Sequence, residues 1–119
     1  MSVLATRAGD TAAARLAAGI ISYALDVPLQ DIIEGGRGPA TVAFARQLAM
    51  YLCNVVFELS LARVAAAFGR DRSTVAHACH AVEDRREEPQ FDLWLAGLEA
   101  MLRGAPAPGW RRATAEARL

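Results

Sequence analysis

The sequence predicts a single all-α domain. Alanine, the strongest helix former, fills 26 of the 119 positions, whereas β-branched and aromatic residues are scarce. Apolar residues make up 54% of the chain and recur at helical spacing, which is enough to bury a core. We place the domain at residues 10–103 and predict a flexible tail at residues 104–119, where proline and glycine cluster.

Two helical elements are expected before the first strong break in the pattern. Apolar residues three and four positions apart predict a helix over residues 11–25, with Asp10 or Thr11 as its N-cap. A short element follows over residues 28–33, where a proline suits the first helical position. The glycine-rich string at residues 35–39 then ends the helical pattern.

A long helix is expected from residue 41 to about 57, with Arg46 and Gln47 off its apolar stripe. Ser60 suits an N-cap, and Gly69 is a glycine of the kind that commonly ends a helix. The helical stripes define a predicted core that contains Leu48, Leu52, Leu61, Val64, Phe68, Val75, Cys79 and Val82.

The last third is expected to contain two more helices. The first begins at Asp71 or Ser73 and ends before Glu87-Glu88-Pro89. Its acidic end, residues 83–88, is interpreted as a solvated helix end with local ion pairs, and a protein-docking surface is the alternative. The last helix is amphipathic and either covers the core or forms a dimer face. Its apolar residues are Phe91, Trp94, Leu95, Leu98, Met101 and Leu102.

The residue inventory excludes several functions. All 13 basic residues are arginine, and without lysine there is neither a Walker phosphate loop nor a Schiff-base enzyme. His77, Cys79 and His80 are too few for a zinc site, so we predict no metal, no cofactor and no enzyme. Cys53 and Cys79 suit a reducing compartment, and no segment is long and apolar enough to span a membrane. No signal peptide is recognisable, so the expected location is the cytoplasm.

Residues 60–86 match a helix-turn-helix, with a short helix, a glycine turn and a second helix. The leading turn of the second helix offers Ser73, Thr74 and His77 as short donors and acceptors for base edges. Arg72 adds a bidentate fork that suits guanine, and the middle third of the chain is basic. Two helices joined by glycine also occur in proteins that bind no DNA, so the pattern alone leaves both interpretations open.

A family resemblance is carried by residues 68–79, Phe68-Gly69-Arg70-Asp71-Arg72-Ser73-Thr74-Val75-Ala76-His77-Ala78-Cys79. This string closely resembles the signature of domain IV of DnaA, the bacterial replication initiator. Residues 45–52 resemble the Arg-Gln helix of that domain, and the likeness runs from about Leu16 to Arg86. It implies an all-helical fold of the Trp-repressor type that binds DnaA boxes in double-stranded DNA.

The resemblance also implies residue roles. Asp71, Ser73, Thr74 and His77 match the family's major-groove residues, and Arg46 and Gln47 match residues near the phosphate backbone. Arg72 stands where the family usually has histidine, and the basic minor-groove loop of the family keeps only Arg37 here. The predicted DNA-binding residues are Arg37, Arg46, Gln47, Arg70, Asp71, Arg72, Ser73, Thr74 and His77.

Three functional hypotheses follow. The leading one is a regulator of chromosomal replication initiation that binds DnaA-box-like duplex DNA and, without the ATPase domain of DnaA, has no ATPase activity. The alternative is a protein-interaction modulator of DnaA or of its regulatory inactivator, with weakened DNA binding. The zero net charge and the loss of loop arginines favour this alternative. The third is a transcription factor with an unrelated operator. The exact DNA target, the oligomeric state and the sign of regulation stay open.

Overall fold

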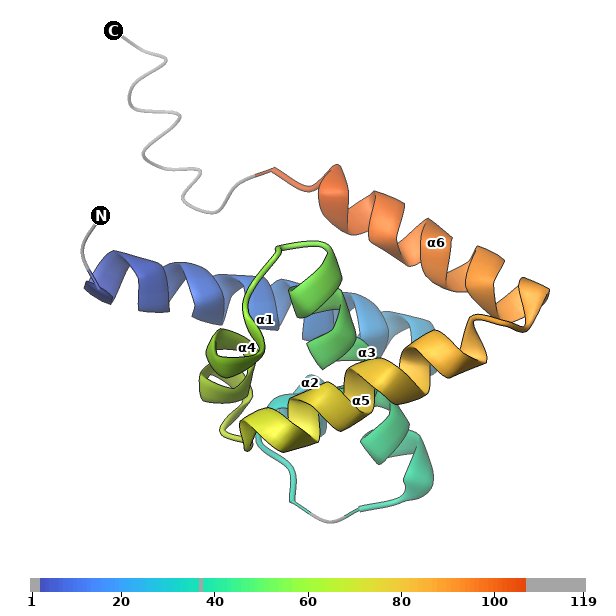
Figure 1. Cartoon of the computed structure of the whole chain (residues 1–119), viewed down its shortest axis with the longest axis horizontal. Helices are drawn as coiled ribbons and strands as arrows, with labels where there is room; N and C mark the ends of the chain where they lie inside the picture. Colours follow the sequence, from blue (N-terminus) through green and yellow to red (C-terminus); the bar gives the residue numbers. More distant parts are fainter. Residues whose placement is uncertain (1–2, 37, 107–119) are drawn as a thin grey trace, which may run out of the picture.

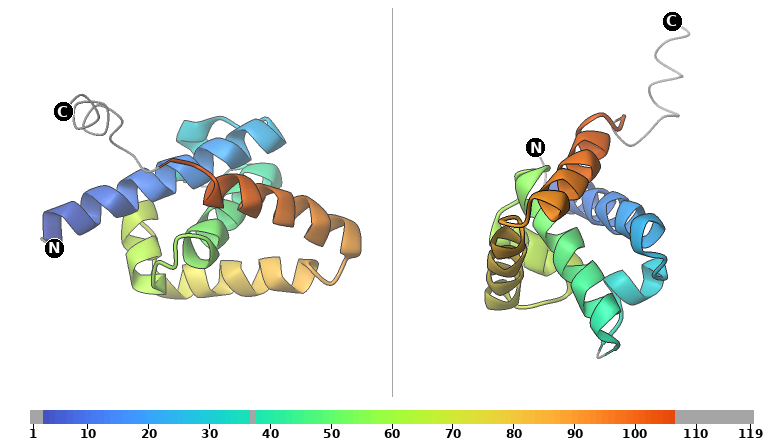
Figure 2. Two further views of the ribbon diagram at one scale, coloured as in Figure 1. Left: turned by 90° about the horizontal axis from the view of Figure 1, so that it is seen from above. Right: turned by 90° about the vertical axis from the view of Figure 1, so that its right-hand side faces the viewer.

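Six α-helices make up the described part of the chain, which in this computed structural model is residues 3–36 and 38–106. These residues contain no strand, so the predicted all-α class is confirmed. The central helix α3 lies between α1 and α5, and it also contacts α2 and α4 (Figures 1 and 2). The helices are α1 (Val3–Leu25), α2 (Leu29–Ile33), α3 (Ala40–Val55), α4 (Leu61–Phe68), α5 (Arg72–Arg85) and α6 (Pro89–Arg103).

The first helix is longer than predicted. It begins at Val3, before residue 10 where we placed the start of the domain, and Asp10 lies inside it rather than at its cap. The Asp10 carboxylate is buried and accepts two hydrogen bonds from Arg63 of α4, with Nη2–Oδ1 at 2.6 Å and Nε–Oδ2 at 3.0 Å. The capping prediction was wrong because this carboxylate bonds a distant guanidinium instead of the start of its own helix. The ion pair ties α1 to α4.

The boundaries of α4 follow the predicted signals. The Ser60 hydroxyl accepts a hydrogen bond from the backbone N–H of Arg63 at 3.2 Å, which confirms it as an N-cap. Gly69 follows the last residue of α4 with φ at 63°, in the left-handed region that glycine adopts without strain. Asp71 occupies the N-cap position of α5, although its side chain makes no capping hydrogen bond.

Most of the predicted core is buried. Leu48, Leu52, Val64, Phe68, Val75 and Val82 are at most 2% exposed. Leu61 and Cys79 pack against this cluster at its edge, where they are half-buried. Both residues line a shallow pocket of about 300 Å³ between α3 and α5, which leaves one side of each open.

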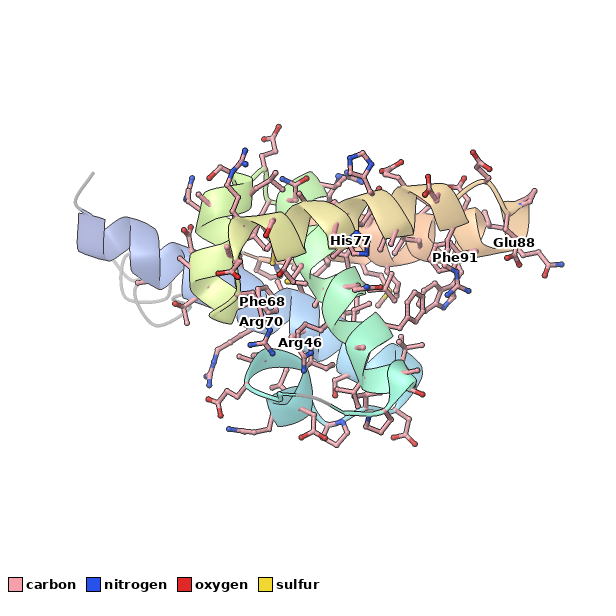
Figure 3. All side chains as sticks on the ribbon, turned by 60° about the horizontal axis from the view of Figure 1, so that its bottom comes forward. Arg46, Phe68, Arg70, His77, Glu88 and Phe91 are labelled. Carbon is pink, nitrogen blue, oxygen red and sulfur yellow. The ribbon has the colours of Figure 1, made fainter. Side chains whose placement is uncertain are left out.

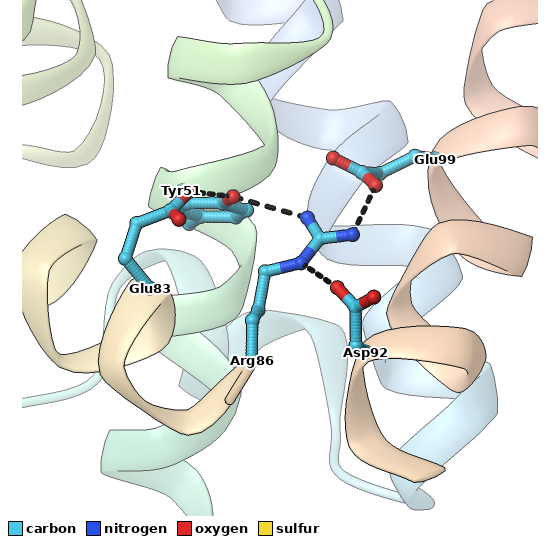
Figure 4. Close-up of polar contacts among 5 residues, drawn as sticks. All are labelled: Tyr51, Glu83, Arg86, Asp92 and Glu99. Atoms are coloured by element: carbon cyan, nitrogen blue, oxygen red, sulfur yellow. Dashed lines mark hydrogen bonds and ion pairs between the residues drawn. The ribbon is translucent and has the colours of Figure 1, made fainter. Parts of the chain in front are cut away.

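The acidic end of α5 is not simply a solvated helix end. Arg86 donates through Nε to Asp92 at 2.5 Å and through Nη2 to Glu99 at 2.9 Å, and both carboxylates belong to α6. Its Nη1 donates to the Tyr51 hydroxyl of α3 at 3.0 Å, and that hydroxyl donates to Glu83 (Figure 4). The hydrogen bond to Glu99 is the main reason why the pKa of Arg86 is raised. The acids Glu83, Asp84, Glu87 and Glu88 are exposed, as a solvated helix end requires. Arg86, in contrast, bonds carboxylates of α6 and the Tyr51 hydroxyl of α3, and so fixes α6 to α5 and α3.

The last helix, α6, covers the core, which was one of the two alternatives predicted for it. Phe91, Leu95, Leu98 and Leu102 are buried, and Phe91 packs near Phe44 of α3. The apolar stripe was too wide, because Met101 is 59% exposed, and the helix also exposes 76% of Leu93. Of the predicted tail, Ala105 donates its N–H to Leu102 at 3.2 Å, whereas residues 107–119 lie outside the described part of the chain.

A first prediction concerns Cys53. Burial raises the pKa of its thiol from 9.0 to about 12. The folded-state pKa of this thiol exceeds its unfolded-state pKa, so the buried neutral thiol contributes to the free energy of unfolding. That contribution is complete below pH 9 and is lost as the pH rises from 9 towards 12. We expect native protein carrying Cys79→Ser to resist alkylation at mildly alkaline pH and to react fully in urea, as measured by mass spectrometry. Rapid labelling of the native variant would contradict the burial of this thiol.

Candidate nucleic-acid interface

The α4–turn–α5 unit holds the candidate interface in a fixed orientation. Val64, Ala65 and Phe68 are the buried residues of α4, and Val75, Ala78 and Val82 are those of α5. In the turn, the backbone N–H of Arg70 donates to Ala65 at 2.9 Å and satisfies a carbonyl at the end of α4. Both helices thus place their apolar faces in the core, and the opposite face of α5 is left for solvent.

The predicted recognition residues gather at the start of α5. Asp71 at the N-cap is exposed, as are Arg72, Ser73 and Thr74 in the first turn. His77, one turn later, is exposed too and is labelled on α5 in Figure 3. Short hydroxyls, an imidazole and a guanidinium on one open helical face can donate to and accept from base edges in a major groove. The free N–H groups at the start of a helix also attract phosphate.

Arg46 lies in the interior rather than off the apolar stripe, which corrects that part of the sequence prediction. Arg46 is only 9% exposed. The Nε donates to the carbonyl of Ile32 at 3.0 Å and the Nη2 to that of Asp31 at 2.7 Å. Main-chain carbonyls at the end of α2 accept two of its donors, so the guanidinium is buried with these N–H groups satisfied. Burial, followed by the nearby charge of Arg70, lowers the pKa of Arg46.

Arg70 is half-buried and bonds the loop that follows α2. Its Nη2 donates to the carbonyl of Gly35, and its Nη1 donates to that of Phe68 at 3.4 Å. Arg46 and Arg70 consequently lie side by side near α2 (Figure 3). Gln47 is half-buried on α3, and Arg37 falls outside the described residues. The structure therefore groups the residues of α5 into one exposed face and gives the two arginines internal contacts.

The sequence interpretation missed Gly35, Asp10 and Arg63 as residues that shape the interface. Gly35 was seen only as part of a helix break, yet its carbonyl holds the Arg70 side chain. Asp10 and Arg63 are 53 positions apart, and nothing in their neighbourhood along the chain pairs them. Long-range contacts of this kind leave no periodic signal, so only the fold reveals them.

No helix in residues 3–36 or 38–106 is long and apolar enough to cross a membrane. Within the same ranges, no three His, Cys, Asp or Glu side chains come together in a way that suits a metal ion.

The similar sequences compared with this chain share one description, DnaA. Residues 18–82 match the model of a family described as the bacterial dnaA protein helix-turn-helix. The chain is 44% identical over 61 residues to the chromosomal replication initiator protein DnaA of Bifidobacterium animalis subsp. lactis (strain AD011), a match that covers 50% of this chain and 10% of that protein. It is 34% identical over 86 residues to DnaA of Symbiobacterium thermophilum, which covers 71% of this chain and 19% of that protein.

A solved structure extends the likeness to the fold. The crystal structure of a DNA replication initiation factor superposes with a TM-score of 0.74 at 27% sequence identity. The superposition covers 85% of this chain and 31% of the other. The chain thus spans less than a third of the length of each of these three similar proteins.

Proposed function

Because this chain belongs to the bacterial DnaA helix-turn-helix family, we propose that it binds DnaA-box-like duplex DNA and regulates the initiation of chromosomal replication, without ATPase activity. The observation that carries the proposal is the exposed polar face of α5. Its first turn, from Asp71 to Thr74, and His77 are open to solvent, whereas the opposite face of the helix is buried. Such a face can enter a major groove without disturbing the core.

The proposal gives each exposed residue a chemical role. Ser73, Thr74 and His77 donate to or accept from base edges, and the Arg72 fork pairs with guanine. Asp71 accepts from a cytosine amino group. Gln47 lies near the phosphate backbone, where Arg46 was also predicted. The internal hydrogen bonds of Arg46 imply that its main effect on binding comes through the shape of the surface.

The charge along α5 favours one end of the helix for DNA. Arg70 and Arg72 flank its start, whereas the four acids Glu83, Asp84, Glu87 and Glu88 outnumber Arg85 and Arg86 near its end. A duplex is attracted to the first end and repelled from the second, because its phosphates are negative. We therefore expect the duplex to lie across the first two turns of α5.

A second prediction tests base reading. His77→Ala is expected to narrow the affinity gap between a DnaA-box duplex and a scrambled duplex by about 1–3 kcal/mol, the value of one good base contact. Fluorescence anisotropy with both duplexes over a salt series measures this gap. Arg72→His should move the base preference towards the ordinary DnaA box, since the family usually has histidine at this position.

Arg15→Ala is the matched control, because Arg15 is an exposed arginine on α1, away from the candidate interface. It should leave the gap between the two duplexes unchanged. If His77→Ala and Arg72→His both bind like the wild type, α5 does not read bases and the proposal fails.

The second candidate function is a protein-interaction modulator of DnaA or of its regulatory inactivator. The exposed Leu93 and Met101 on α6 favour it, since exposed apolar side chains grouped on one element suit contact with a protein. Equal, weak binding of the wild type to both duplexes would support this candidate over the first.

A further inference from the structure

The turn before α5 is joined to the loop that follows α2. We call Gly35, Gly36, Gly38 and Pro39 the glycine loop. Arg70 lies between Gly69 and the N-cap of α5, and its backbone is held by the hydrogen bond to Ala65. From this fixed point its Nη2 reaches across 35 positions of sequence to the Gly35 carbonyl.

The other side of this contact is tightly packed. The Gly35 N–H donates to the carbonyl of Asp31 at 3.1 Å. A Cβ atom at position 35 would lie 2.4 Å from that same carbonyl oxygen and 3.0 Å from Nη2 of Arg46. Glycine is therefore required for the close approach, and any side chain there must move the main chain that Arg70 bonds. Arg46 adds a second connection to the same segment, because its side chain donates to the Asp31 and Ile32 carbonyls.

The side chains of Arg46 and Arg70 bond main-chain atoms, and the nearby charge of Asp31 acts against the lowering of the Arg46 pKa. Among the described residues, the hydrogen-bond acceptors of Arg46 and Arg70 are all main-chain carbonyls. The two guanidiniums are close enough that the charge of Arg70 lowers the pKa of Arg46. The contact of Arg70 with Gly35 therefore joins the turn before α5 to the end of α2.

We propose that Arg70 is a positioning residue, which ties the start of α5 to the Gly35 carbonyl and so holds the exposed face of α5 in one orientation for a duplex. This inference rests on the proposed function. A surface that is already ordered loses less conformational entropy on binding than two segments that move independently. Arg70 then raises affinity through Gly35 rather than through its own contact with a phosphate.

The test uses the full chain with Arg70→Ala, Arg70→Lys, Gly35→Ala and the double variant Arg70→Ala/Gly35→Ala. Circular dichroism melts first establish that each variant folds, and Arg15→Ala is the arginine control. Arg70→Ala and Gly35→Ala are each expected to weaken binding to the box duplex about tenfold, or 1.4 kcal/mol. The double variant should be no weaker than either single one, because both break the same contact.

Two readouts distinguish a direct phosphate contact of Arg70 from its positioning role. A phosphate ligand contributes about −0.9 to the slope of log affinity on log salt, so loss of a positioning residue should change the slope by much less. Arg70→Lys keeps the charge but lacks the planar fork that bonds two carbonyls, and it should also weaken binding. In DNA-free protein, the NMR amide signals of Gly35, Gly36 and Gly38 should shift in Arg70→Ala and stay in place in Arg15→Ala.

Three results overturn the inference. One is unmoved glycine signals in Arg70→Ala; another is full affinity in Arg70→Lys together with a slope reduced by about 0.9 in Arg70→Ala. The third is wild-type protein that does not prefer the box duplex, which removes the proposed function as well. The glycine signals then still report whether Arg70 holds the loop, so the two failures are told apart.

Discussion

Replacing Phe68 with alanine is expected to lower the free energy of unfolding by about 3–5 kcal/mol, the usual loss for a buried aromatic side chain. Phe68 is 2% exposed and is the last residue of α4, immediately before the Gly69 turn. Its removal leaves a cavity where the two helices of the helix-turn-helix meet. Chemical denaturation followed by circular dichroism measures the change.

Leu93→Ala is the matched control for Phe68→Ala. Leu93 is also a large apolar residue on a helix, but 76% of it is exposed, so its truncation removes little buried area. The control should change stability by less than about 0.5 kcal/mol. Equal stability of the two variants would show that Phe68 is not packed as described.

The second large effect is expected at Arg86. Arg86→Ala leaves the Glu99 carboxylate, whose side chain is 8% exposed, without its guanidinium partner. Removal of one member of a buried ion pair typically costs about 3–5 kcal/mol, and the 17% exposure of Arg86 places the expected loss near the lower end. The loss should appear in denaturation curves at neutral pH.

Two further variants make the Arg86 prediction specific. Glu99→Gln added to Arg86→Ala removes the uncompensated charge and should restore part of the stability. Arg103→Ala removes an exposed arginine from α6, the helix that carries Glu99, and should change the free energy of unfolding little. An Arg86→Ala variant as stable as Arg103→Ala would contradict the role of the network in Figure 4.

The sequence predicts best where the signal is local. Ser60 and Gly69 mark the ends of α4 because a cap acts on the backbone within three residues of it. The exposed face of α5 was likewise predictable, since helical periodicity alone separates Ser73, Thr74 and His77 from the buried Val75.

The sequence predicts poorly where a polar side chain is buried by a distant partner. Arg46 was assigned to the polar side of its helix, because a pattern of residue types cannot show that the Asp31 and Ile32 carbonyls of α2 lie within reach of its side chain. Asp10 was taken for a cap for the same reason, as its partner Arg63 comes from α4. In both cases the fold supplies the hydrogen-bond partner that makes burial of the charge possible.

The Asp10–Arg63 ion pair connects α1 directly to the first helix of the helix-turn-helix. At about 1.5 Å per residue, the 23 residues of α1 form a rod roughly 34 Å long. The pair fastens this rod to the first turn of α4, and Phe68 at the other end of α4 packs into the core beside α5. The position of α1 at Asp10 and the orientation of α5 are therefore linked through α4, and the exposed face of α5 depends on a contact made outside the helix-turn-helix.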